Sequence, residues 1–221
     1  RKFVPAYEGN LRKHALSVPR CISECSGIRV FGRRIKSLVF STDVAIIKNI
    51  NADAIIAVYP FTPQPAITQA IIGVSEVPVF CGVGGGLTNG VRSASRAAYV
   101  EHQGAYGVVC NSKIGVETIH AIKDAVEIPV VYTVISENTD IQPYLTAGVD
   151  IINVSGAART PEIVGTLRQR YPELPIIATG GPTEESILAT IRAGANAITY
   201  TPPSSASLFA KTMAGNRSEL E

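Results

Sequence analysis

Short apolar runs recur along this chain in two alternating forms, and the pattern is the strongest signal in the sequence. In one form a proline precedes the run, as in "VPVFCGV" at 77–83, "IPVVYTV" at 128–134 and "LPIIATG" at 174–180. In the other form a small residue or glycine precedes it, as at 52–59, 104–111, 148–155 and 194–201. Each form returns every 44–52 residues. Such self-similarity indicates one supersecondary unit that is repeated along the chain.

Helical patterns fill the gaps between the apolar runs. The segment "TPEIVGTLRQRY" places Thr160 as N-cap and Pro161 at the first helical position. The segment "TEESILATIRAG" places Thr183 as N-cap, with Gly194 just beyond the helix end. Strands that alternate with helices predict right-handed βαβ units and a parallel sheet.

Eight strands can be counted in this way. They are expected near 35–40, 54–59, 79–83, 106–111, 130–135, 150–155, 176–179 and 197–201. Eight such units predict an α/β fold, a single (β/α)8 TIM barrel with parallel strands. An open doubly wound sheet is disfavoured because its strands would not repeat so regularly. The first strand is the least certain, since residues 21–40 fit either one strand or a short hairpin that covers the bottom of the barrel.

We assign the whole chain, 1–221, to this one domain. Within it we distinguish a basic N-terminal segment (1–33), the barrel (34–213) and a C-terminal tail (214–221). Nine of the 20 Lys and Arg residues lie within residues 1–40. This basic segment is either a solvated surface or a region that meets an anion.

Alignment of the repeats places polar residues at the carboxyl ends of the strands, where barrels of this kind hold their active sites. Tyr59, Asn111, Ser155 and Thr201 occupy equivalent positions, and Ala57, Val109, Asn153 and Thr199 lie two residues before them. Thr133 and Thr179 are equivalent on the other strands. We therefore predict a substrate-lining set of Tyr59, Thr133, Asn153, Ser155 and Thr179. The alternative is that these side chains only hydrogen-bond to one another at a wet barrel end.

Two glycines, Gly180 and Gly181, lie between the seventh predicted strand and the next helix. They serve either a sharp turn that only glycine tolerates, or a phosphate that backbone amides near a helix N-terminus would bind. Loops after strands seven and eight commonly hold phosphate in this fold. The predicted phosphate-binding set is Gly156, Gly180, Gly181, Thr201 and Ser204, with Ser205 as a further candidate.

The stretch "IIATGGPT", with "VDIINVSGA" before it and the polar end of strand eight after it, resembles the phosphate-binding half of aldolase-type and ribulose-phosphate-binding barrels. The motif agreement covers roughly 150–205. The resemblance implies a small phosphorylated metabolite as ligand. Those families usually place a glycine after strand eight, whereas this chain has Pro202 and Pro203, which have no N–H to donate.

Two acidic residues near strand ends are candidates for catalysis. Asp43 and Glu137 could act as general acid or base, and Asn111 could orient a carbonyl or hydroxyl group. The competing interpretations are a helix N-cap for Asp43 and a solvated loop position for Glu137. An imine mechanism is disfavoured, because the only lysine within a predicted strand is Lys36. Lys113 lies near the mouth, two residues beyond Asn111.

A second glycine cluster, "GVGGGLTNG" at 82–90, follows the third predicted strand. Its Gly84–Gly86 stretch indicates a mobile loop over the mouth or the close approach of a ligand.

Cysteine and histidine usage changes the picture little. Cys81 and Cys110 lie in apolar runs and are expected to be buried, reduced thiols, and Cys21 and Cys25 lack the partners of a zinc site. His14, His102 and His120 do not form a metal-ligand pattern, so we expect no metal site. With 46% hydrophobic residues and no apolar run near 18 residues, we expect no membrane partner. We expect a cytoplasmic location.

The leading hypothesis is an enzyme that acts on a small phosphorylated metabolite, of the isomerase, epimerase or carbon–carbon lyase type. The alternatives are an FMN-dependent oxidoreductase, a non-catalytic metabolite sensor or RNA-binding regulator, and a hydrolase. No cofactor is predicted, and FMN is the open alternative. We do not expect a nucleic-acid partner, since no aromatic–basic RNA motif is present; a homo-oligomer is left open.

Overall fold

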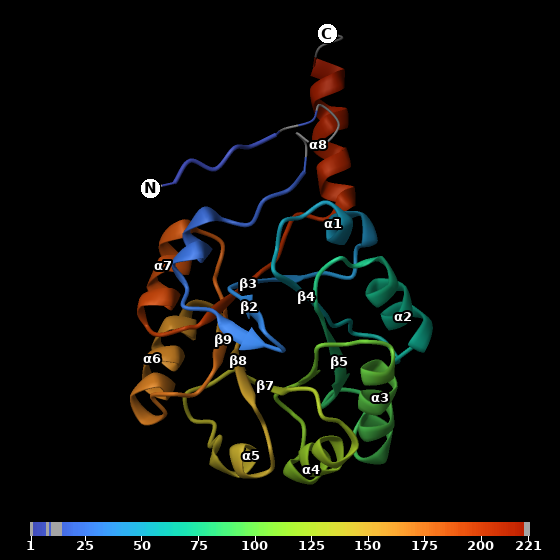
Figure 1. Cartoon of the computed structure of the whole chain (residues 1–221), viewed down its shortest axis with the longest axis vertical. Coiled ribbons are helices and arrows are strands. Elements are labelled where there is room, and N and C mark those ends of the chain that lie inside the picture. The colour runs from blue at the N-terminus through green and yellow to red at the C-terminus, as the bar shows by residue number, and fades with distance from the viewer. Residues whose placement is uncertain (1, 8, 10–14, 219–221) are drawn as a thin grey trace.

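The computed structural model describes residues 2–7, 9 and 15–218. Eight parallel strands close into a barrel in the order β10-β3-β4-β5-β6-β7-β8-β9 (Figure 1). The strands are β3 (Ser37–Phe40), β4 (Ala54–Ala57), β5 (Val79–Gly84), β6 (Gly107–Cys110), β7 (Val130–Val134), β8 (Ile151–Val154), β9 (Ile176–Thr179) and β10 (Ala197–Tyr200). All eight predicted strands and the (β/α)8 fold are confirmed.

Helices follow the barrel strands in turn. They are α1 (Val44–Lys48), α2 (Pro65–Val74), α3 (Val91–His102), α4 (Val116–Ala125), α5 (Gln142–Thr146), α6 (Thr160–Arg170), α7 (Glu184–Arg192) and α8 (Ser205–Ser218), with the 3-10 turn η2 (Ala157–Arg159) before α6. Thr183 caps α7 as predicted, in a reciprocal capping box with Ser186. The predicted cap of α6 is wrong by one residue, since Thr160 is already helical and Arg159 precedes it.

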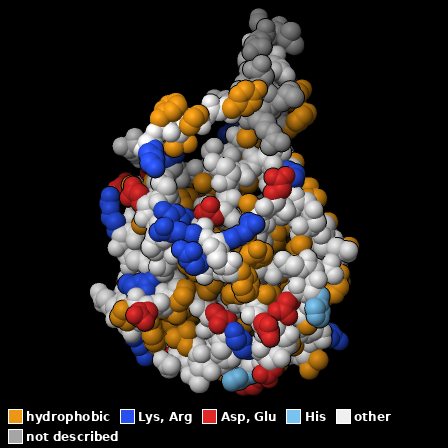
Figure 2. Space-filling model, in the orientation of Figure 1, with side chains coloured by type: hydrophobic (Ala, Val, Ile, Leu, Met, Phe, Trp, Pro, Cys, Tyr) orange, Lys and Arg blue, Asp and Glu red, His pale blue; other side chains and the backbone are white. Residues whose placement is uncertain are grey.

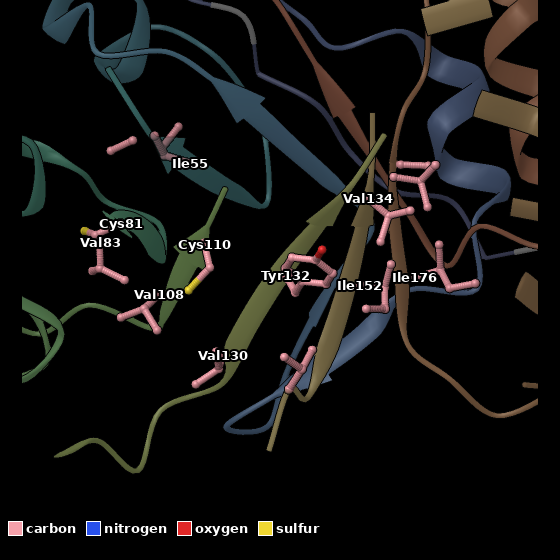
Figure 3. Packing of buried hydrophobic residues seen from close by; sticks show 14 of the residues in the cluster. Ile55, Cys81, Val83, Val108, Cys110, Val130, Tyr132, Val134, Ile152 and Ile176 are labelled. Atoms are coloured by element: carbon pink, nitrogen blue, oxygen red, sulfur yellow. The ribbon is translucent and has the colours of Figure 1, made fainter. Parts of the chain in front are cut away.

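Two apolar layers pack against the two faces of the barrel wall. The outer layer lies between strands and helices and contains Ile55, Cys81, Val108, Tyr132 and Ile152 (Figure 3). The inner layer fills the lower barrel with Leu38, Ile56, Phe80, Val109, Val131, Ile151 and Ile177. Alternate residues of each strand supply the two layers, as the period of two requires.

The basic N-terminal segment closes the bottom of the barrel with a hairpin, which settles the alternative left open by the sequence. Strands β1 (Ile28–Val30) and β2 (Arg33–Ile35) pair antiparallel. Val30 and Ile35 are buried in the inner layer, and Phe31 packs edge-on against Tyr106, just before β6. Lys and Arg side chains gather over this hairpin on the face shown in Figure 2. Arg1, Arg12, Lys13 and His14 lie outside the described residues.

Lys36 does not reach the mouth of the barrel. Its Nζ donates to the carbonyl of Ser23, within the 3-10 turn η1 (Arg20–Glu24). A Schiff-base lysine must face the reacting carbon, so this contact argues against that role for Lys36.

The last helix, α8, projects away from the barrel (Figure 1). None of its described side chains is buried. The predicted boundary at 213/214 lies inside this helix rather than at its end. Among the described residues no helix is long and apolar enough to cross a membrane.

All four cysteines are buried free thiols. Burial raises the pKa of Cys81 and of Cys110 to about 12. The prediction of buried thiols at these two positions is therefore confirmed.

Candidate functional site at the barrel mouth

A pocket of about 900 Å³ opens at the carboxyl ends of the barrel strands. Its lining includes Tyr59, Asn111, Thr133, Asn153, Ser155, Thr179 and Thr201. The structure thus brings the whole predicted substrate-lining set together in one cavity. Glu137, Asp43, Gly156, Gly180, Gly181 and Ser204 are not among its lining residues.

The polar lining lies nearer to the carboxyl ends of the strands than the apolar inner layer does. On β8, for example, Ile151 is buried in the inner layer, and Asn153 and Ser155 line the pocket two and four residues later. The alignment of the repeats is wrong by one residue on β4, where Ile56 and Val58 line the pocket. Ala57 belongs to the outer layer instead. Tyr59 still reaches the pocket because β4 ends at Ala57 and the strand alternation ends with it.

Two cationic side chains, Arg96 and Lys113, line the pocket. In the described part of the chain no Asp or Glu joins them in the lining, and neither forms an ion pair. A cavity with two cations and no carboxylate favours an anionic ligand.

Arg96 is held in place by two hydrogen bonds to the protein. Its Nε donates to the carbonyl of Gly82 at 2.9 Å, and its Nη2 donates to Tyr59 Oη at 2.9 Å. The guanidinium also lies over the Tyr59 ring, 5.8 Å from the centroid. These contacts use two of its five N–H groups, so three remain for a ligand.

Tyr59 and Asn111 are already engaged in local hydrogen bonds. Tyr59 Oη donates to the carbonyl of Gln64 and accepts from the Gln64 amide, in addition to its bond from Arg96. Asn111 Oδ1 accepts from the Lys113 amide at 3.2 Å and from Ser112 Oγ at 3.3 Å. The Asn111 amide nitrogen, rather than its oxygen, is therefore the group that could orient a ligand.

Two buried oxygens on the floor of the pocket have no hydrogen-bond partner among the described residues. They are Asn153 Oδ1 and Thr199 Oγ1. The other end of the Asn153 side chain donates to Thr133 Oγ1 at 3.3 Å. A buried polar atom without a partner is costly, and a ligand that donates hydrogen bonds would remove that cost.

The predicted phosphate-binding glycines are largely engaged by the protein itself. The Gly180 amide donates to the Thr199 carbonyl at 3.2 Å, and the Gly156 amide donates to Thr160 Oγ1 at 3.0 Å. Neither amide is free to bind phosphate in this structure. Gly180 is also packed so closely that an added Cβ would lie 2.7 Å from Ile198.

Gly181 has φ +80°, and an added Cβ would lie 2.6 Å from Ser186 Oγ. The steric interpretation of this glycine therefore holds whether or not an anion binds beside it. Glu184 and Glu185 occupy the first turn of α7, where their charges would oppose a phosphate.

Asp43 stabilises two helix N-termini. Its Oδ1 accepts from the amides of Ala45 and Ile46 at the start of α1, and its Oδ2 accepts from the Ser205 amide at 3.0 Å, at the start of α8. Hydrogen bonds from Ser205, and then from the α1 amides, hold the pKa of Asp43 below its ordinary value. A carboxylate of the protein thus occupies the anion-binding position at α8. Ser204 Oγ likewise accepts from the Ser207 amide within the first turn of α8.

Glu137 forms an ion pair with Arg159. Its own backbone amide, and then Arg159, lower the pKa of Glu137. Such a group stays ionised near neutral pH. The catalytic roles of Glu137 and Asp43 stay predictions, and the structure gives each of them a structural contact outside the pocket lining.

Arg96 is the charged lining residue that sequence reasoning missed. It lies in α3, so neither the strand alternation nor a motif points to it. His102 and His120 are exposed, and the described residues contain no group of three His, Cys, Asp or Glu that could hold a metal ion.

No protein-family model matches the chain, and no curated protein matches it. Solved structures share its fold. Phosphoenolpyruvate phosphomutase from Streptomyces platensis subsp. rosaceus is 15% identical with a TM-score of 0.63, over 90% of this chain and 83% of that one. A phosphonopyruvate hydrolase in complex with oxalate and Mg²⁺ is 16% identical with a TM-score of 0.65, over 85% and 82%.

A mandelate oxidase mutant with an FMN adduct is 16% identical with a TM-score of 0.60, over 80% of this chain and 68% of that one. These three proteins carry out different reactions on one fold. The likeness therefore shows a TIM barrel, and the site has to indicate the chemistry.

Proposed function

We propose that the protein is an enzyme that acts on a small phosphorylated or otherwise anionic metabolite, held at the mouth of the barrel. The observation that carries this proposal is the pair of cations, Arg96 and Lys113, in a pocket whose described lining holds no carboxylate. The three free N–H groups of Arg96 suit the oxygens of a phosphate or carboxylate. The fold neighbours named for phosphoenolpyruvate and phosphonopyruvate chemistry support an anionic substrate.

The floor of the pocket would bind the rest of the polar part of the substrate. Asn153 Oδ1 and Thr199 Oγ1 are acceptors without a partner, so they suit substrate hydroxyl groups. In this proposal the anion binds to Arg96 and Lys113 on the β5–β6 side of the mouth. The glycine pattern favours the opposite side, at β9–β10. A reaction of the isomerase, epimerase or carbon–carbon lyase type needs a proton-transfer group. Lys113 is the described lining side chain that could serve, because the Tyr59 hydroxyl is already bonded to Gln64 and Arg96.

The test is a ligand screen by thermal shift with inorganic phosphate, glycerol 3-phosphate, ribose 5-phosphate and oxalate. Ligands that bind the native state raise the melting temperature. For a compound that binds, we expect Arg96→Met to weaken binding by about 10- to 100-fold, because a hydrogen bond to a charged group contributes about 1.5–3 kcal/mol. Calorimetric titration measures the change.

Arg92→Met is the matched control, since Arg92 is exposed on the same helix and does not line the pocket. We expect its affinity to stay within twofold of the wild type. Equal losses in both variants would contradict the proposal, as would a screen in which no anion binds. The FMN, RNA-sensor and hydrolase alternatives stay predictions, and a yellow colour of the purified protein would favour the first of them.

A further inference from the structure

The mouth pocket has two unlike halves. The ends of β6 to β10 supply most of the polar lining described above, and Arg96 and Tyr59 add to it from α3 and the β4–α2 connection. The neighbouring β3, β4 and β5, with the segments that follow them, supply four apolar lining residues, Phe40, Val58, Phe61 and Leu87, which we call the apolar wall. These residues come from the end of β3, the β4–α2 connection and the β5–α3 connection, so three separate segments converge on one side of one cavity.

Three of the four wall residues are unusually exposed. Phe40 keeps 41% of its surface accessible, Phe61 68% and Leu87 75%. Single exposed apolar residues are common and need no explanation. Exposed apolar residues that converge on a cavity do need an explanation, because apolar patches of this kind mark sites that bind a ligand or a partner.

The apolar wall lies next to Arg96. Arg96 Nε is bonded to the Gly82 carbonyl, and Val58 lies against Gly82, where an added Cβ would be 3.0 Å from Val58 Cγ2. An anion bound by Arg96 would therefore carry its attached group along the edge of the wall. The pocket volume of about 900 Å³ also exceeds what a two- or three-carbon anion fills, since pockets of roughly 300–1,000 Å³ take ligands of drug size.

We propose that the substrate is an amphipathic anion, in which a phosphate or carboxylate is attached to an apolar alkyl or aryl group. The anion contacts Arg96 and Lys113, and the apolar group covers Phe61 and Leu87. This inference rests on the proposed function, because it uses the same anion site.

A series of alkyl phosphates tests the inference directly. Inorganic phosphate, methyl phosphate, butyl phosphate and hexyl phosphate present the same anion with increasing apolar length. We expect the dissociation constant, measured by calorimetric titration, to fall about two- to fourfold for each methylene that the wall buries.

A double variant, Phe61→Ser with Leu87→Ser, should remove this dependence on chain length while inorganic phosphate binds as before. Both positions are exposed, so the substitution leaves the core intact. Phe209→Ser is the matched control, since Phe209 is 70% exposed but lies on α8, away from the pocket lining. The control should keep the full dependence on chain length.

The possible results separate this inference from the proposed function. If all four phosphates bind equally and Arg96→Met weakens them all, the anion site stands and the apolar substrate is overturned. If the double variant weakens all four alike, the wall closes over any anion, which also overturns the inference. If affinity rises with chain length but is unchanged in the Arg96→Met variant, the apolar wall is supported and the proposed anion site is overturned. If none of the four binds, the apolar substrate is overturned, and the anion site is overturned only if the wider screen with oxalate and the sugar phosphates fails as well.

Discussion

The two sides of the barrel mouth use polar groups in opposite ways. On the β9–β10 side, amides and helix N-termini bond to the protein's own oxygens, with the Gly180 amide on Thr199 and the Ser205 amide on Asp43. On the β5–β6 side, Arg96 and Lys113 have no carboxylate partner among the described residues. On the side with the glycine motif, the amides of Gly180 and Ser205 are therefore occupied by the protein, whereas the side without a recognised motif keeps two positive charges for a ligand. A glycine pair indicates room for a turn, but only its surroundings show whether its amides are free.

The largest effect on the β9–β10 side is expected from Asp43→Ala. The variant removes the acceptor for the amides of Ala45, Ile46 and Ser205, so two helix starts lose a cap. We expect the free energy of unfolding to fall by about 1–2 kcal/mol, measured by urea denaturation. Affinity for glycerol 3-phosphate should stay within twofold.

The pH dependence of stability sharpens this prediction. Because the pKa of Asp43 is lowered by folding, its contribution is present at pH values above the unfolded pKa and is lost as the pH falls through the folded pKa. The wild type should therefore lose more stability than Asp43→Ala on acidification below about pH 4. Lost turnover with unchanged stability would instead give Asp43 the catalytic role predicted from the sequence.

Gly181→Ala should produce the next largest effect. At φ +80° an L-residue is strained, and the added Cβ would lie 2.6 Å from Ser186 Oγ. We expect a loss of about 1 kcal/mol in unfolding free energy, with little change in the affinity for glycerol 3-phosphate. Gly215→Ala on α8 is a control that meets no atom within 4 Å and should not destabilise the fold. A large loss of phosphate affinity with unchanged stability would restore the phosphate site at β9.

The smallest effect is expected from Lys113→Met on the opposite side. Lys113 is exposed, so solvent and salt weaken its attraction for an anion. We expect affinity for glycerol 3-phosphate to fall about three- to fivefold at low salt and the difference to shrink at 0.5 M salt. Lys211→Met, on α8, should change nothing. An equal change at both salt concentrations would indicate that Lys113 acts through direct hydrogen bonds rather than charge.

Most of the fold could be predicted because it depends on local patterns. The proline–apolar and small–apolar phrases place seven of the eight barrel strands, β4 to β10, and Thr183 is recognisable as a cap from its neighbours alone. The alignment error on β4 arose because this strand begins two residues after Ala52, whereas β6, β8 and β10 begin three residues after Gly104, Gly148 and Gly194. Tyr59 lies two residues beyond the end of β4, where strand alternation no longer sets the direction of a side chain.

The site was predicted in part. Residues such as Thr133 and Asn153, which are on strands, reach the pocket because barrel closure turns alternate side chains inward. Arg96 was missed because it reaches the mouth from a helix, and its direction depends on contacts with Gly82 and Tyr59, which lie 14 and 37 residues away in the chain.

The sequence by itself determined the repeat, the barrel, the polar ends of the strands and the glycine that a left-handed turn at 181 requires. These follow from side-chain periodicity and local backbone geometry, which neighbouring residues set. Only the tertiary structure decided which donors stay free. Asp43 and Ser205 are 162 residues apart in the chain, yet their bond fills the anion position at α8. Hydrogen-bond partners of this kind are brought together only when the barrel closes. The positive charge of the pocket that remains without a carboxylate partner among the described residues is therefore that of Arg96 and Lys113, and it does not lie beside the glycine pair.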